Sequence, residues 1–130
     1  MTRLVLSFLA FAALSASGPT GTWQGTFWSA ETERAGSLQF TVTAEGRVLD
    51  ALAIFDAVPD LPLALEAAVL DESSIEGRFE PYRDPGCGCW LDTTFRGALE
   101  DDRWLGTYTV RAEAGAVFHG AWTAHRSPDP

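Results

Sequence analysis

Three segments decide the fold: FRGAL at residues 95–99, WLGTY at residues 104–108 and FHGAW at residues 118–122. Each has the pattern apolar-x-Gly-x-apolar, and two more copies occur at residues 23–27 and 75–79. Positions i, i+2 and i+4 of a strand share one face, so every copy places a glycine between two large side chains. Glycine inside a strand marks a bend or a close approach, and repeated glycine kinks are typical of a strongly curved or closed sheet.

The segments between these copies read as turns and as further strands. Glu100-Asp101-Asp102-Arg103 forms an acidic turn between the first and second of the three segments quoted above, and Glu113-Ala114-Gly115 lies between the second and third, so the three form a meander. Residues 36–43 alternate between apolar and polar side chains, which is the pattern of a half-buried strand. We therefore predict an all-β fold, either a small antiparallel β-barrel or a strongly curved meander sheet, with about six to eight strands.

Residues 60–70, with the sequence DLPLALEAAVL, fit two structures. Asp60 could cap a short helix that has Pro62 in its first turn. Leu63, Leu65 and Val69 also alternate as they would in a strand. We favour the strand, because it would complete a hairpin with the segment that begins at Ile75.

The N-terminus predicts export. Arg3 precedes an apolar run, LVLSFLAFAAL at residues 4–14, and small residues follow it, as in a cleaved secretory signal. We predict a signal peptide at residues 1–17, one β-barrel-like domain at residues 18–126 and a disordered tail at residues 127–130, with an uncleaved anchor as the alternative. Lysine and asparagine are absent, which suggests a GC-rich bacterial genome. The expected location is the periplasm or the extracellular medium.

The charge excludes one class of partner. The chain has a formal net charge of −9 at pH 7, and all of its basic residues are arginines. A strongly acidic protein is repelled by phosphate backbones and by anionic membrane surfaces. We expect no nucleic-acid partner and, once the signal is removed, no stable membrane insertion. No segment after the signal approaches the ~20 apolar residues of a membrane-spanning helix.

The two ends of the predicted domain carry a family resemblance. Gly21-Thr22-Trp23 opens the first strand, and the last strand runs through Trp122 to Arg126. This resembles the pattern of the calycins, the lipocalin-like and avidin-like barrels. The resemblance implies a barrel in which Arg126 packs over Trp23, beside Gly21, and closes one end. An arginine on an indole face is a favourable cation–π contact.

Cys87-Gly88-Cys89 is the most unusual local feature. These are the only cysteines, and in an oxidising compartment they are expected to form a disulfide with each other. A metal-linked or redox role, an intermolecular bridge and free thiols remain alternatives. Two thiolates do not complete a zinc site, and His119 and His125 would lie about 20 Å apart along one strand. We therefore predict no metal site and assign both histidines to a solvated face.

The tryptophans suggest a binding site. Trp23, Trp104 and Trp122 lie on the glycine-containing faces, so they would point into a barrel. A small barrel either fills with side chains or holds one small ligand. We expect a filled core and keep an aromatic cavity, with these three tryptophans as ligand contacts, as the sharper hypothesis.

No catalytic constellation and no cofactor motif is found, so we expect a non-enzymatic module without a cofactor. Its leading predicted function is the binding of a small apolar or aromatic molecule. The alternatives are a metal- or redox-linked protein centred on Cys87 and Cys89, and a structural or interaction domain.

Overall fold

The computed structural model describes residues 18–84 and 87–127, which form strands and connecting turns and contain no helix. Residues 1–17 and 128–130 lie outside the described residues, so the signal peptide and export stay predictions. Ser127, the first residue of the predicted tail, donates its backbone N–H to the Thr22 carbonyl at 2.8 Å. The strands are β1 (Gly21–Ser29), β2 (Arg34–Val42), β3 (Val48–Phe55), β4 (Leu63–Asp71), β5 (Ser74–Phe79), β6 (Tyr82–Arg83), β7 (Trp90–Glu100), β8 (Arg103–Ala112) and β9 (Val117–Arg126).

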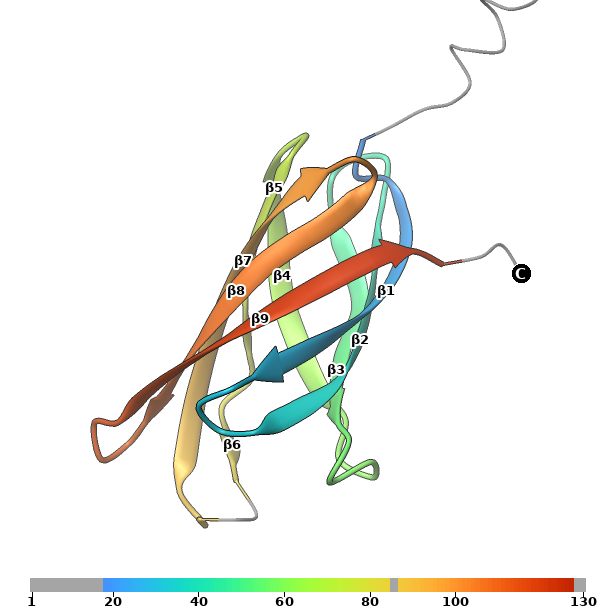
Figure 1. Cartoon of the computed structure of the whole chain (residues 1–130). Helices are drawn as coiled ribbons and strands as arrows, with labels where there is room; N and C mark the ends of the chain where they lie inside the picture. The colour runs from blue at the N-terminus through green and yellow to red at the C-terminus, as the bar shows by residue number, and fades with distance from the viewer. Residues whose placement is uncertain (1–17, 85–86, 128–130) are drawn as a thin grey trace, which may run out of the picture.

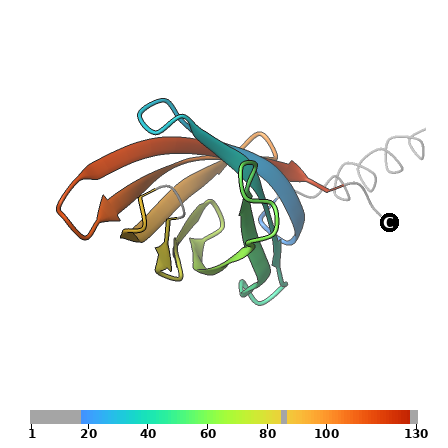
Figure 2. The same ribbon diagram turned by 90° about the horizontal axis from the view of Figure 1, so that it is seen from below.

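Eight of these strands close into an antiparallel barrel (Figure 1). Consecutive strands pair from β1 to β5 and from β7 to β9, and the pairs β5–β7 and β1–β9 join the two runs. The short strand β6 pairs with the beginning of β7 as an extra strand. Figure 2 shows the strands curving around a common interior. The predicted all-β fold is confirmed, and of the two predicted forms it is the closed barrel.

The repeated glycines make room for aromatic rings on the facing strand. Gly106 lies opposite Trp122, and a Cβ at Gly106 would come within 2.4 Å of indole atoms. Gly120 lies opposite Tyr108, and a Cβ there would meet the phenol ring at 2.2 Å. The rings therefore lie across the glycines, which is one way in which a curved sheet fills the space left by a missing side chain. The sequence pattern predicted this arrangement of glycine beside large inward-facing rings.

Most of residues 60–70 lie in strand β4 (Leu63–Asp71). The favoured strand prediction is therefore confirmed, and the helix alternative is wrong. Its register places Ala67 opposite Gly77 and Leu65 opposite Phe79, and it forms the expected hairpin with β5. Leu65, Ala67 and Val69 pack against the hydrophobic core. Burial of one face in the barrel decides the structure here, over the helix-forming preference of leucine and alanine.

The barrel has two different ends. One end, uppermost in Figure 1, carries residues 18–20 and the tight turns after β2, β4 and β7. At the last of these turns, Asp101 and Asp102 both have positive φ, 51° and 61°, as the two-residue hairpin loop requires. The other end carries the connections after β1, β3 and β8 and the short strand β6. We call the first the closed end and the second the open end.

Candidate ligand-binding cavity

The three tryptophans predicted as ligand contacts lie towards the closed end, where side chains fill the barrel. Trp23 and Trp104 are completely buried and Trp122 is 4% exposed. The rings of Trp23 and Trp104 meet edge to face with centroids 5.9 Å apart. Trp122 borders a void of only about 20 Å³, which is too small for an organic ligand.

Arg126 covers the closed end. Its guanidinium lies 4.5 Å from the centre of the Trp23 ring and donates hydrogen bonds to the carbonyls of Thr20 and Gly18, both at 2.6 Å. Arg126 also pairs with Asp102 at 2.8 Å. Gly21 has a φ of 138°, and a Cβ there would approach the Arg126 guanidinium to 2.7 Å. The structure therefore contains the Arg–Trp contact that the calycin resemblance implies.

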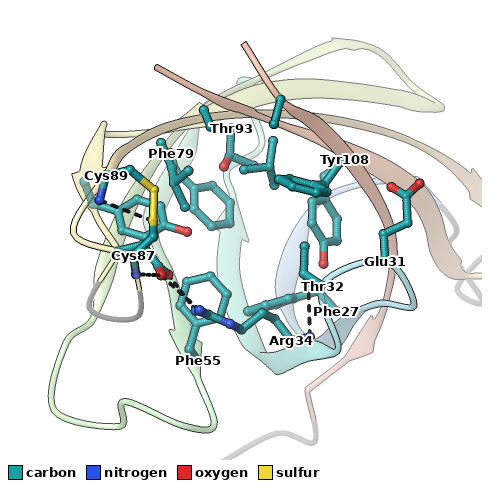
Figure 3. Close-up of a pocket in the computed structure, with 17 residues that line it drawn as sticks. Phe27, Glu31, Thr32, Arg34, Phe55, Phe79, Cys87, Cys89, Thr93 and Tyr108 are labelled. Atoms are coloured by element: carbon teal, nitrogen blue, oxygen red, sulfur yellow. Dashed lines mark hydrogen bonds and ion pairs between the residues drawn. A yellow bond between two sulfur atoms is a disulfide. The ribbon is translucent and has the colours of Figure 1, made fainter. Parts of the chain in front are cut away.

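A cavity of about 590 Å³ occupies the open end, as the close-up in Figure 3 shows. A volume of several hundred Å³ is the range in which proteins hold small organic ligands. The wall is mainly aromatic and aliphatic, and every barrel strand except β4 contributes to it. Its apolar and aromatic members are Phe27, Phe55, Phe79, Tyr82, Leu91, Tyr108, Val110, Ala112, Ala116 and Phe118.

Thr93 is a polar group on this apolar wall. It lies on β7, is 1% exposed, and its Oγ1 has no hydrogen-bond partner among the described residues. In Figure 3 the hydroxyl is turned towards the barrel interior, near Phe79. A buried hydroxyl without a partner costs about 1–3 kcal/mol, so such groups are rare and call for an explanation. The cavity provides one, because a ligand in it could satisfy the hydroxyl.

Two tyrosines also face the cavity. Burial raises the pKa of Tyr108 to about 12, because the phenolate would lose its hydration. Burial also raises the pKa of Tyr82, and the negative charge of Asp84 adds to this effect. Neither hydroxyl hydrogen-bonds to another described residue. Both therefore remain neutral and can donate to or accept from a ligand at any physiological pH.

An ion pair spans the rim of the cavity between β2 and the segment after β6. The two terminal nitrogens of Arg34 bind the two carboxylate oxygens of Asp84 at 2.6 and 2.9 Å. Asp84 is 3% exposed and also accepts the backbone N–H of Cys87 at 3.1 Å. Hydrogen bonding to Asp84 is the main reason why the pKa of Arg34 is raised. Bidentate geometry of this kind fixes both side chains in position.

Cys87 and Cys89 form a disulfide at the same rim, with their Cα atoms 5.2 Å apart. Cys87 is exposed and Cys89 is half-buried. Arg83 donates to the Gly88 carbonyl at 2.6 Å and stacks on Trp90 with 4.9 Å between the guanidinium and the ring centre. The Asp84 backbone also holds this segment, because its N–H donates to the Cys89 carbonyl at 2.9 Å.

The structure provides no set of metal ligands to support the metal-linked alternative. The described ranges contain no group of three or more His, Cys, Asp and Glu side chains that could hold an ion. His119 points outwards with 65% of its side chain exposed, and its Nδ1 lies 3.4 Å from Glu31. Within the same ranges, no helix is long and apolar enough to cross a membrane.

The three tryptophans predicted as ligand contacts and the cavity at the open end lie at different places in the barrel. None of Trp23, Trp104 and Trp122 lines the cavity, whereas Cys87 and Cys89, predicted for another role, do. Arg34, Asp84 and Thr93 were not singled out. One signal could have identified Thr93: it is a polar residue at an inward position of a strand whose next inward residue is Phe95.

Comparison of the chain with models of protein families, with curated proteins and with solved structures finds no match in any of the three. The function is therefore argued from the geometry of the barrel and its cavity.

Proposed function

We propose that this domain binds one small, mainly apolar molecule in the cavity at the open end of the barrel. The observation that carries the proposal is the cavity itself, about 590 Å³ in volume and bordered largely by aromatic rings. An apolar cavity of this size leaves its wall without contact partners, and a ligand would supply them. The gain is about 25 cal/mol for every Å² of apolar surface removed from water.

The position of the cavity supports a binding role. Four connections surround its mouth, and the closed end is packed, so a ligand would enter from the open end only. The rim ion pair between Arg34 and Asp84 holds two distant segments together, so the binding site is formed before the ligand arrives. Preformed sites avoid the entropic cost of ordering side chains during binding.

The direct test is a cavity-filling substitution. Val110 lies on the wall and is half-buried, so a tryptophan there would occupy the space of the ligand. The neutral fluorescent probe N-phenyl-1-naphthylamine reports binding by its enhanced emission. We expect the natural protein to bind one equivalent, and Val110→Trp to weaken binding by about tenfold or more, which corresponds to ~1.4 kcal/mol.

Two further variants make this test decisive. Ala112→Trp fills the cavity nearer its mouth, in case Val110→Trp impairs folding. Thr107→Trp on the same strand adds the same ring to the outer, exposed face and should bind the probe as the natural protein does. Absence of probe binding by the natural protein, or unchanged binding by folded Val110→Trp and Ala112→Trp, would contradict the proposal.

The same proposal includes an origin and a location. A distant relationship to the calycins is supported by the closed eight-stranded barrel and by the contact of Arg126 with Trp23. Export from a bacterium is supported by the signal-like sequence of residues 1–17. An intact mass of the protein purified from its native compartment tests signal cleavage, because cleavage would remove the N-terminal segment, whereas a full-length mass would favour the uncleaved anchor.

A second candidate function is thiol–disulfide exchange at Cys87–Cys89, favoured by the exposure of Cys87 at the cavity rim. A substrate thiolate would attack one cysteine sulfur, break the S–S bond and release the other cysteine as a thiolate, which leaves a mixed disulfide. A second substrate thiolate would then attack the substrate sulfur of the mixed disulfide, so that the two substrate sulfurs leave as a disulfide and the protein keeps two thiols. Exposed bridges exchange most readily. Incubation with millimolar reduced glutathione should yield oxidised glutathione and two protein thiols, and a bridge that stays intact would exclude this function.

A further inference from the structure

The charged groups of the cavity lining restrict the charge that a ligand can carry, because they comprise two carboxylates, Glu31 and Asp84, and one guanidinium, Arg34. Arg34 is the only cationic residue in the described part of the lining. Both of its terminal nitrogens already bind the Asp84 carboxylate, whose side chain is 5% exposed. An anionic ligand that took over these two donors would leave the buried Asp84 carboxylate without this cation, which is strongly unfavourable. The charge of Arg34 is therefore compensated by Asp84 within the protein, which weakens its attraction for an anionic ligand.

Glu31 adds a negative charge that the site does not neutralise. It lies at the mouth with 51% of its side chain exposed, and Figure 3 shows its carboxylate at the edge of the cavity. It accepts the backbone N–H of His119 and lies beside the His119 ring. Apart from the His119 ring, no basic side chain among the described residues pairs with Glu31. The net charge of the whole chain, −9 at pH 7, has the same sign.

The interior provides hydrogen-bonding groups but no charge. Thr93 carries a buried hydroxyl without a partner, and the neutral hydroxyls of Tyr82 and Tyr108 lie on the same wall. A hydroxyl can meet one polar group of a ligand, whereas it cannot compensate a full charge that has left water. An apolar wall with a few such groups suits an uncharged molecule.

We propose that the cavity selects uncharged apolar molecules that carry a hydrogen-bonding group, and that it rejects apolar anions such as long-chain carboxylates. This inference rests on the proposed function, because it specifies the ligand class of the same cavity. Discrimination comes from two carboxylates: Glu31 repels an anion, and Asp84 compensates Arg34, the one cationic side chain in the described part of the lining. Charge placed in this way provides specificity more than affinity.

Two probes with the same ring system test the selection. N-phenyl-1-naphthylamine is uncharged, and 8-anilinonaphthalene-1-sulfonate is the same molecule with one sulfonate. At pH 8 and low salt, we expect the natural protein to bind the uncharged probe with a dissociation constant about tenfold or more below that of the sulfonate. The uncharged probe is also more apolar, which by itself favours its binding. The effect of charge is therefore measured by how the ratio of the two dissociation constants changes between variants.

Glu31→Lys should strengthen binding of the sulfonate by about tenfold and change binding of the uncharged probe by no more than about twofold. Glu72→Lys is the matched control, because it changes the net charge equally in the exposed turn after β4, at the closed end. Asp84→Asn, which releases the charge of Arg34, should also favour the sulfonate. Glu72→Lys should leave both dissociation constants unchanged.

The outcomes separate this inference from the proposed function. Failure of the uncharged probe to bind would overturn both. Binding of the uncharged probe that is lost in Val110→Trp, together with a ratio that neither Glu31→Lys nor Asp84→Asn alters, would leave the cavity as the binding site and overturn its charge selection. An equal effect of Glu72→Lys and Glu31→Lys would also overturn it, because the effect would then be due to net charge alone.

Discussion

At the closed end the rings of Trp23 and Trp104 touch each other under Arg126, whereas at the open end the rings of Phe27, Phe55 and Tyr108 border a cavity. Both ends are rich in aromatic side chains. The difference lies in what stands between the rings. At the closed end the rings of Trp23, Phe40 and Trp104 pack against one another, and at the open end the smaller side chains Ala112, Ala116 and Thr93 leave space in the wall. The number of aromatic residues therefore does not indicate where a ligand binds.

Each end also holds one buried polar atom without a hydrogen-bond partner in the described part of the chain, and their surroundings differ. The Trp104 Nε1 lies in the packed half, where the rings of Trp23 and Phe40 surround the indole. The Thr93 hydroxyl lies beside open volume. The first can make only weak contacts with aromatic faces, whereas the second can obtain a full hydrogen bond from a ligand.

The largest expected effect concerns the packed end. Trp104→Ala should lower the free energy of unfolding by about 3–5 kcal/mol, because it leaves a large void in a fully buried site. Phe118→Ala removes a half-buried ring from the cavity wall and should cost about 1 kcal/mol. Urea denaturation followed by far-ultraviolet circular dichroism measures both. Equal losses for the two variants would mean that the two ends are packed alike.

The next effect is a dependence on alkaline pH that belongs to the open end. A free tyrosine has a pKa of about 10. Burial raises the pKa of Tyr108 to about 12, and the pKa of Tyr82 is raised as well. The unfolded chain therefore loses these protons at lower pH than the folded one. Stability from the neutral tyrosines is complete below about pH 10 and is lost as pH rises through the folded-state pKa.

Absorbance at 295 nm measures this directly, because Tyr82 and Tyr108 are the only tyrosines of the chain. We expect little tyrosinate at pH 11 in the folded protein and about 90% ionisation in the unfolded protein. Tyr108→Phe should reduce the loss of stability between about pH 10 and 12. Reversible ionisation near pH 10 without unfolding would show that the hydroxyl is in contact with solvent and that the cavity is open to bulk water.

The sequence was sufficient for the barrel because its signals are periodic and local. Glycine between large residues at alternate positions specifies both the inward face and the curvature, as Gly106 opposite Trp122 shows. The acidic turn at Asp101 and Asp102 was likewise readable from residue type. The extra strand β6 was missed, because Tyr82 and Arg83 lie in a segment whose proline and glycine content is typical of a loop.

The site was harder to predict because it depends on contacts between distant segments. Arg34 and Asp84 are fifty positions apart, and nothing local to either residue indicates an ion pair. The alternation in a sequence shows which strand residues point into a barrel. It does not show at which level along the barrel axis the packed interior ends and a cavity begins. The tryptophans attracted attention through their size, yet size is what makes them fill the interior.

Thr93→Val is the last and smallest of the expected effects, and it separates a structural role from a binding role. Valine has nearly the shape of threonine, so the change removes a buried hydroxyl that has no partner and should stabilise the ligand-free protein by about 1 kcal/mol. Thr94→Val on the exposed face is the matched control and should have almost no effect. If the Thr93 hydroxyl forms a hydrogen bond with a ligand, Thr93→Val should also lower the affinity for ligands that bear a hydrogen-bonding group. Stabilisation without any loss of such binding would mean that the ligand does not reach Thr93, and destabilisation would mean that the hydroxyl has a partner in the folded protein.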